Sequence, residues 1–280
     1  MRGSNLSRIS SRSLIGIALL AASLFAPGAG DQPQASAADP FDFAPADFLI
    51  LSADGQRVVG RSHYHLDRDS RGAILNGENR YLDGQYDVET DHLVRQPGDA
   101  LPGLAAFDHS FFNADGSPQR RGRADLMSGL ASCTSYRDGV PTTRTATIKF
   151  PDDTWAGASV FAPIQRFLSD GAAGPLKLHV YSCTPSPSVL TLEASVDRSS
   201  SRWPLYRGDA LKVVLKPKFG WWDIIIRPFL PQFHAWFDPS RQFRLVGAEF
   251  ARFYRGPEII MAETPLSAPA SAPPVVGKQQ

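Results

Sequence analysis

Short strand-like segments fill most of the chain, and Asp-Gly pairs separate several of them. Asp-Gly occurs at 54–55, 83–84, 115–116 and 138–139. Glycine adopts the positive φ that tight hairpin turns require, so these pairs predict turns between antiparallel strands. The strand-like segments are RVVGRSHYHLD, AILNGENRY, QYDVETDHLV, TTRTATIKF, LKLHVYSC, VLTLEASV, ALKVVLKPKF, FHAWF and FRLVGAEFARFY. The pattern predicts a meander of antiparallel strands.

One segment has helical character. Between Asp152 and Gly171 acidic residues come first and a glycine ends the run, as is typical of helix boundaries. Pro163 does not fit the middle of a helix, so we expect a short helix from near Ala162 to before Gly171, preceded by a turn. The predicted fold is mainly β: a single large curved or spiralled antiparallel sheet, or an open barrel, with one short helix.

The first 30 residues have the order of a secretory signal peptide. Arginines precede an apolar run at 14–25, and small residues follow. That run is too short to span a bilayer; a retained N-terminal anchor is the alternative. Cleavage is expected after Gly30 or Ala37. The predicted organisation is signal peptide (1–30), disordered lead (31–40), single β-rich domain (41–263) and disordered Ala/Pro/Ser tail (264–280).

Composition narrows the class of protein. A formal net charge of +1 gives no global attraction to nucleic acid, and 42% hydrophobic with 20% charged residues is typical of a globular chain. Cys133 and Cys183 are the two cysteines. In an exported chain they predict one structural disulfide, with two free thiols or a redox pair as alternatives. Cys-x-x-Cys spacing, which favours redox chemistry, is absent.

Polar side chains at strand spacing are the candidates for chemistry. His63, His65 and Asp67 share one face of a strand, where two imidazoles and a carboxylate suit Zn²⁺ with a bound water. A solvent-exposed strand face is the alternative, because the sequence specifies no distant ligand. Asp87 and Glu89 also share a face, but acid–base catalysis needs a pKa raised by burial. We expect that face to be wet, without such a shift.

Other motifs give little support for an enzyme. The chain has no G-x-S-x-G, H-E-x-x-H, S-x-x-K, P-loop or G-x-G-x-x-G motif, so catalysis is less favoured than binding, and no cofactor is expected. The basic residues 120–123 suit anionic headgroups or, alternatively, a solubilising strand face. A metal-dependent hydrolase built on His63, His65 and Asp67 remains the alternative function.

The stretch FGWWDIIIRPFLPQFHAWF, residues 219–237, is the most aromatic passage outside the N-terminus. Its internal charges and prolines exclude a transmembrane helix. At strand spacing, Phe233 and Phe237 lie on one face and Trp236 on the other, so both faces need a cover. That cover is either protein, including the short helix, or an amphiphile in a groove. The groove residues would be Trp221, Trp222, Phe229, Phe233 and Trp236.

The segment FPDDTWAGASVFAPIQRFLSDGAAGPLKLHVYSCTPSPSVLTLEA, residues 150–194, carries a resemblance. Its Phe-Pro…Thr phrase, short helix, glycine loop and return strand resemble β-rich periplasmic proteins of unknown function. These include the cell-envelope-integrity type with a spiralled sheet, and the curved sheets of lipoprotein carriers are also similar. The resemblance implies an envelope role, as a scaffold or by binding an amphiphile, with a disulfide as a common feature. We therefore expect a periplasmic or secreted non-enzymatic protein whose partners are a lipid-like amphiphile or envelope proteins.

Overall fold

The computed structural model describes residues 46–68, 70–95, 101–171, 173–198, 203, 205–218, 233–252 and 256–264. All of them lie in one compact unit, residues 39–280. The strands are β1 (Ala46–Ser52), β2 (Val58–Arg68), β3 (Gly72–Tyr81), β4 (Tyr86–Arg95), β5 (Pro102–Phe112), β6 (Pro118–Asp125), β7 (Leu130–Arg137), β8 (Val140–Thr147), β9 (Thr154–Trp155), β10 (Leu176–Cys183), β11 (Pro187–Asp197), β12 (Leu211–Lys218), β13 (Phe233–Asp238), β14 (Arg244–Ala251) and β15 (Glu258–Glu263). The α-helix of the described part is α1 (Phe161–Ser169), preceded by the 3-10 turn η1 (Gly157–Val160), and η4 (Pro239–Arg241) follows β13.

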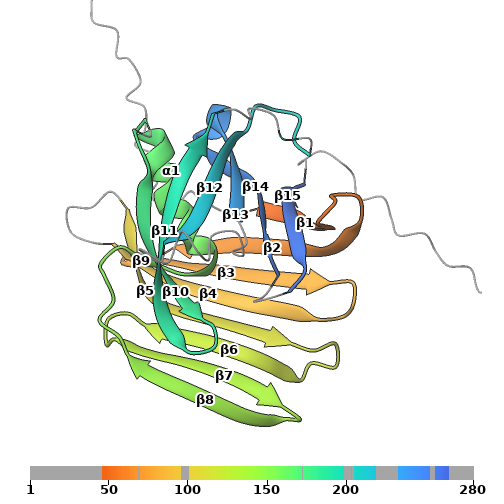
Figure 1. The fold of residues 1–280 in the computed structure, drawn as a ribbon, viewed down its shortest axis with the longest axis vertical. Coiled ribbons are helices and arrows are strands. Elements are labelled where there is room, and N and C mark those ends of the chain that lie inside the picture. The colour runs from red at the N-terminus through yellow and green to blue at the C-terminus, as the bar shows by residue number, and fades with distance from the viewer. Residues whose placement is uncertain are drawn as a thin grey trace, which may run out of the picture. The chain divides into compact units, whose positions relative to one another are not determined.

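All fifteen strands join one sheet made of two meanders. The order is β8-β7-β6-β5-β4-β3-β2-β1-β15-β14-β13-β12-β11-β10-β9. Neighbours are antiparallel except β9 and β10, which are parallel. The first meander, β1 to β8, lies in chain order in Figure 1. Since only residues 148–153 connect the edge strands β8 and β9, the sheet must curve to bring its two edges together. The predicted fold class, a single large curved open sheet with one short helix, is confirmed.

The four Asp-Gly pairs at 54–55, 83–84, 115–116 and 138–139 are turns, as predicted, and their chemistry repeats. Each glycine has a positive φ, and at 138–139 Asp138 (51°) and Gly139 (77°) both do, which defines a type I′ hairpin turn. In the other three turns the aspartate accepts a hydrogen bond from the backbone N–H two residues on: Asp54 from Gln56 (3.1 Å), Asp83 from Gln85 (3.0 Å) and Asp115 from Ser117 (2.9 Å).

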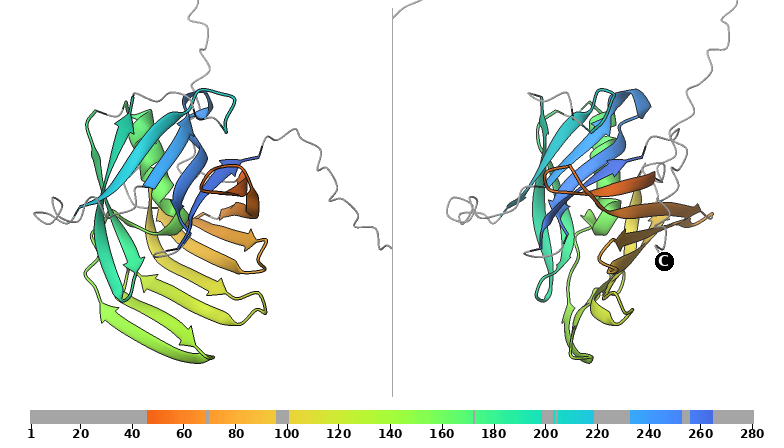
Figure 2. Two further views of the ribbon diagram at one scale, coloured as in Figure 1. Left: turned by 45° about the vertical axis from the view of Figure 1, so that its right-hand side comes forward. Right: turned by 90° about the vertical axis from the view of Figure 1, so that its right-hand side faces the viewer.

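Helix α1 lies on the inner face of the sheet, which we define as the face that carries the larger core. In both views of Figure 2 it lies between β10–β12 and β3–β5. Phe161 packs edge-on against the fully buried Phe237 of β13, with ring centroids 6.3 Å apart. Pro163 falls in the first turn of the helix, where its missing donor is not needed. The predicted helix, and its cover over one face of β13, are therefore observed.

A second core covers the outer face of the sheet. Trp236 of β13 stacks on Trp203, with centroids 4.7 Å apart and planes at 12°. A Cβ at Gly247 would collide with the Trp203 ring, so the absence of a side chain lets the indole lie on β14. The cluster also contains Leu51, Ala210, Val246, Ile260 and Ala262. Strand β13 is thus buried on both faces, and within the described residues protein provides both covers.

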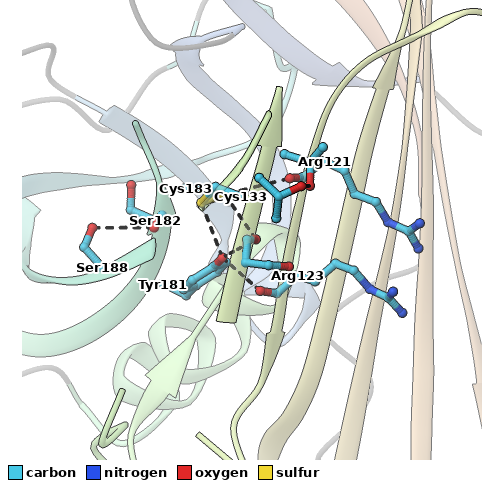
Figure 3. Close-up of a disulfide and its surroundings, with 10 residues drawn as sticks. Arg121, Arg123, Cys133, Tyr181, Ser182, Cys183 and Ser188 are labelled. Carbon is cyan, nitrogen blue, oxygen red and sulfur yellow. Dashed lines mark hydrogen bonds between the residues drawn. A yellow bond between two sulfur atoms is a disulfide. The ribbon is translucent and has the colours of Figure 1, made fainter. Parts of the chain in front are cut away.

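A disulfide joins Cys133 of β7 to Cys183 of β10, as predicted (Figure 3). Each of these strands is second from its edge of the sheet, and the two edges are opposite, so the bond links the two ends of the sheet. Beside it, the Tyr181 hydroxyl donates to the backbone carbonyls of Arg123 (2.9 Å) or Ser132 (3.2 Å). A Cβ at Gly122 would approach Cys183 to 3.1 Å, so glycine leaves space for the bond.

Several sequence predictions lie outside the described residues. They are the signal peptide, the lead at 31–40, the tail beyond Thr264, and Trp221, Trp222 and Phe229. Among the residues that are described, no helix has the length and apolar composition needed to cross a membrane.

Candidate functional site

Three carboxylates of β4 form an acidic cluster on the inner face of the sheet. Asp87, Glu89 and Asp91 occupy alternate positions, and their residues are 2%, 5% and 0% exposed. The sequence interpretation of Asp87 and Glu89 as a wet strand face is wrong. Acidic residues are rarely buried without partners, so the partners of each carboxylate decide what the cluster does.

Two of the carboxylates hold the segment that enters α1. Glu89 Oε1 accepts a hydrogen bond from the backbone N–H of Ala158 (2.6 Å), and Asp91 Oδ2 accepts one from Ser159 (3.1 Å). Gly157 has φ 48°, and a Cβ there would collide with the Glu89 carboxylate. Glycine therefore permits both the backbone conformation and the close approach. These bonds fix η1, and with it α1, to the sheet.

His109 of β5 lies between the carboxylates. Its Nε2 is 2.8 Å from Asp87 Oδ1, and its Nδ1 is 3.7 Å from Glu89 Oε2. The same Asp87 oxygen accepts a hydrogen bond from Asn79 Nδ2 at 2.8 Å. The imidazole is 20% exposed, whereas its carboxylate partners are buried. His109 is thus more exposed to solvent than the carboxylates that it contacts.

Burial dominates the electrostatics of the cluster. It raises the pKa of Glu89, against the opposing effects of His109 and the Ala158 N–H. It raises the pKa of Asp91 well above its usual range, and the neighbouring Glu89 charge adds to the rise. Asp91 Oδ1 is buried without a hydrogen-bond partner among the described residues, so a proton on this carboxyl group avoids an uncompensated buried charge. Burial lowers the pKa of His109, but the hydrogen bond and charge of Asp87, with the charge of Glu89, raise it overall.

These shifts give a pH dependence of stability whose sign is fixed. Glu89, Asp91 and His109 all bind protons more tightly in the folded chain. The free energy of unfolding therefore falls as pH rises from about 4 through the raised pKa values. Asp83, whose pKa the Arg252 hydrogen bond lowers, acts in the opposite sense, and only as pH falls below about 4.

Asp91→Asn should reduce this pH dependence. The amide can accept from Ser159 and donate to Glu89, which mimics the protonated acid. We expect a free energy of unfolding within about 1 kcal/mol of wild type near pH 5, and a decline toward alkaline pH that is shallower by up to about 1.4 kcal/mol per pH unit. Urea unfolding at several pH values measures it. The control Asp67→Asn changes an exposed carboxylate, and equal slopes in all three proteins would contradict the assignment.

An aromatic row continues from the cluster along the inner face. It consists of Phe111, His109, Phe107, Tyr181 and Phe150. Successive ring centroids are 4.2, 6.0, 5.7 and 6.2 Å apart. Phe107 and Tyr181 are buried, while Phe111, His109 and Phe150 are half-buried. The row is therefore a partly open apolar surface that ends beside buried charge.

Two guanidinium groups lie at the polar end of this row. Arg120 lies over the Phe111 ring at 3.7 Å, and Arg252 over the Tyr81 ring at 3.4 Å. Arg252 also donates to Asp83 (2.9 Å) and Gln85 (3.1 Å). The basic residues at 120–123 are thus split between the faces. Arg121 and Arg123 both pair with Asp108 on the outer face, the second at 3.0 Å.

The predicted metal ligands do share one face of β2, and that face is exposed. His63 Nδ1 is 2.6 Å from Asp47 Oδ1, and His65 Nε2 is 3.4 Å from Asp67 Oδ2. The imidazole rings of His63 and His65 stack with centroids 5.8 Å apart. Across the described ranges, no group of three or more His, Cys, Asp or Glu side chains is arranged to hold a metal ion.

The described members of the predicted groove lie on opposite faces of β13. Phe233 is half-buried against the inner core, and Trp236 is 6% exposed in the outer cluster. The structure does not bring these two side chains together. Sequence reasoning did not bring His109 and the aromatic row beside the carboxylates of β4, because no strand was predicted at 102–112. One signal was available in the sequence. Asp91 and Leu93 are two residues apart on the strand, so their side chains point to the same face, and Leu93 belongs to the core.

The likeness of the chain to known proteins is distant. No protein-family model matches the chain, and no curated protein matches it. Among solved structures, the chain is similar to a β-barrel-like protein of a domain of unknown function, DUF1849, from Brucella abortus. The identity is 10%, the match covers 79% of this chain and 96% of that chain, and the TM-score is 0.44. We therefore infer function from the residues of this chain.

Proposed function

We propose that the protein is an exported, non-enzymatic envelope protein that binds an amphipathic ligand on the inner face of its sheet. The aromatic row carries this proposal. Phe111 and His109 are half-buried neighbours, and Arg120 lies directly over the Phe111 ring. An apolar surface that ends in a cation matches the two ends of a fatty acid or a lysophospholipid.

The two ends of such a ligand would be bound by different forces. Its apolar chain gains about 25 cal/mol for each Å² removed from water along the aromatic row. Its anionic head faces the Arg120 guanidinium, which lies over the Phe111 ring. Stacking on aromatic rings holds Arg120 and Arg252 in place before binding, which lowers the entropy cost of recognition.

Two further observations support an exported binding protein. A structural disulfide is stable in oxidising compartments such as the periplasm or the extracellular medium. The Glu89 and Asp91 carboxylates already accept hydrogen bonds from Ala158 and Ser159. Those bonds hold η1 in place, which favours a structural role for the two acids over turnover of a substrate.

Replacing Phe111 should weaken binding, and replacing its neighbour Phe112 should not. Phe112 lies on the same strand but on the outer face, stacked on Tyr86 at 4.7 Å, and is also half-buried. With a fluorescent fatty acid as probe, we expect Phe111→Ala to raise Kd about tenfold, because it removes part of the apolar surface. Phe112→Ala should leave Kd unchanged. No saturable binding by wild type, or equal losses in the two variants, would contradict the proposal.

A further inference from the structure

The two edges of the open sheet are protected very differently. At one end, β9 is two residues long, Thr154–Trp155, and both are buried. At the other end, β8 is eight residues long, and within the described residues no strand pairs with its outer side. A long unpaired edge presents a row of backbone donors and acceptors to another strand.

The hairpin register shows which groups of β8 face outward. Arg137 and Val140 flank a two-residue turn, so they form a hydrogen-bonded pair, and the pairs alternate from there. Two contacts agree with this alternation. Ile148 N donates to Gly129 O at 2.8 Å, and the Oγ1 atoms of the non-hydrogen-bonded pair Thr134–Thr143 are 2.9 Å apart.

The outward backbone groups therefore belong to Thr143, Thr145 and Thr147. Each directs its N–H and C=O away from β7. Pro141 is the preceding outward residue, and it has no N–H. A strand added to this edge can form a regular ladder along 143–147, which ends at Pro141.

The usual devices that block an edge are sparse along this ladder. Arg144 is the one charged residue of β8, and the β7–β8 pairing has no bulge. Apolar side chains are exposed around the hairpin: Leu130 at 59%, Val140 at 64% and, in the preceding turn, Met127 at 81%. Leu130 pairs with Thr147 at one end of the hairpin and Val140 with Arg137 at the other, so exposed apolar side chains lie at both ends of this edge.

We propose that the edge of β8 pairs antiparallel with β8 of a second copy of the chain, around a two-fold axis at Thr145. In this register Thr145 faces the partner's Thr145, and Thr143 faces the partner's Thr147. All three outward threonines then exchange hydrogen bonds, and threonine pairs of this kind stabilise antiparallel sheets. Arg144 faces the partner's Ala146, so the register places no two charges directly opposite. The strand is self-complementary, as a two-fold interface requires.

The oligomeric state of the full-length mature protein tests this pairing. A single strand pair is smaller than the ~1,200 Å² of a stable interface, so sedimentation equilibrium should show a dimer that dissociates on dilution. Thr145→Lys places two cations directly opposite and should abolish the dimer. Ser132→Lys is the control. Ser132 is the neighbour of Thr145 on β7 and lies on the same face but one strand away from the edge, so this variant should still dimerise. A monomer at every concentration, or equal dimerisation by Thr145→Lys, would overturn the proposal.

Crosslinking tests the register independently of affinity. In a hydrogen-bonded antiparallel pair the Cα atoms are about 5.5 Å apart, within reach of a disulfide. Thr145→Cys should therefore form a covalent dimer on mild oxidation. The matched control Thr143→Cys should not, because its counterpart lies four residues away along the ladder. Circular dichroism before oxidation verifies that each variant is folded. Efficient crosslinking through Thr143→Cys but not Thr145→Cys would overturn the register.

Discussion

Trp236→Ala should lower the free energy of unfolding by about 3–5 kcal/mol, the range for a large aromatic side chain truncated in a core. Trp236 is 6% exposed and stacks on Trp203, and Val246 and Ile260 belong to the same cluster. Truncation leaves a cavity bounded by Trp203, and that ring then loses its partner. Urea unfolding monitored by circular dichroism measures the loss.

His234→Ala is the matched control for this substitution. His234 lies two residues earlier on the same face of β13, half-buried, with Nδ1 2.8 Å from Glu249 Oε2. Its loss should cost about 1 kcal/mol, because the pair is partly exposed. A Trp236→Ala protein of wild-type stability would show that the outer cluster contributes nothing to the fold. It would also return Trp236 to the candidates for direct ligand contact.

Removal of the disulfide should cost about 4 kcal/mol, because Cys133 and Cys183 are separated by 50 residues and the bond restricts the unfolded chain. The double variant Cys133→Ala, Cys183→Ala and the reduced wild-type protein should lose the same amount. Both cysteines lie where the β10–β11 hairpin approaches β7. Without the disulfide, the hydrogen bonds of the Tyr181 hydroxyl to the carbonyls of Arg123 and Ser132 still connect these strands. Ser132→Ala is the control.

The size of the loss in the free energy of unfolding shows whether the disulfide stabilises the fold by restricting the unfolded chain. A loss near 4 kcal/mol agrees with an entropic restraint on the unfolded chain. A loss below about 1 kcal/mol in both the double variant and the reduced protein would contradict that account. It would mean that the unfolded chain is already restricted in the same region.

Local chemistry allowed much of the fold to be predicted from the sequence. The Asp-Gly pairs specify hairpin turns because glycine takes positive φ and aspartate caps the turn. The helix could be placed from Pro163, which is acceptable in the first turn of a helix but not in its middle, and from Gly171, which follows its C-cap with a positive φ. The acidic residues at 152–153 do not cap it, because its N-cap is Val160. Strand β5 was missed because Pro102–Phe112 lacks regular alternation of apolar and polar residues.

The candidate site could not be predicted in the same way. Alternate acidic residues in a strand normally mark its solvent face. Here the groups that compensate their burial come from distant parts of the chain. Ala158 and Ser159 lie 69 and 68 residues beyond their carboxylate partners, and His109 lies 22 residues beyond Asp87. Only the tertiary fold brings these groups together, so periodicity alone assigned the wrong face.

The stretch from Phe219 to Phe237 illustrates both outcomes. Its strand parity correctly separated Phe237 from Trp236, because side chains alternate between the faces of a strand. Phe161 covers Phe237 on one face, and Trp203 covers Trp236 on the other. No pattern in the sequence indicates that these residues pack against this strand. In the described part both covers are protein. The proposed ligand surface therefore lies at the aromatic row, on β5.

Native mass spectrometry of the protein, purified without detergent, tests ligand binding most directly. We expect the intact mass together with a heavier species that corresponds to a bound fatty acid or lysophospholipid. Added fatty acid should populate that species in wild type and Phe112→Ala, and much less in Phe111→Ala. A single apo mass that is unchanged by excess fatty acid or lysophospholipid would contradict the proposal that the inner face binds an amphiphile.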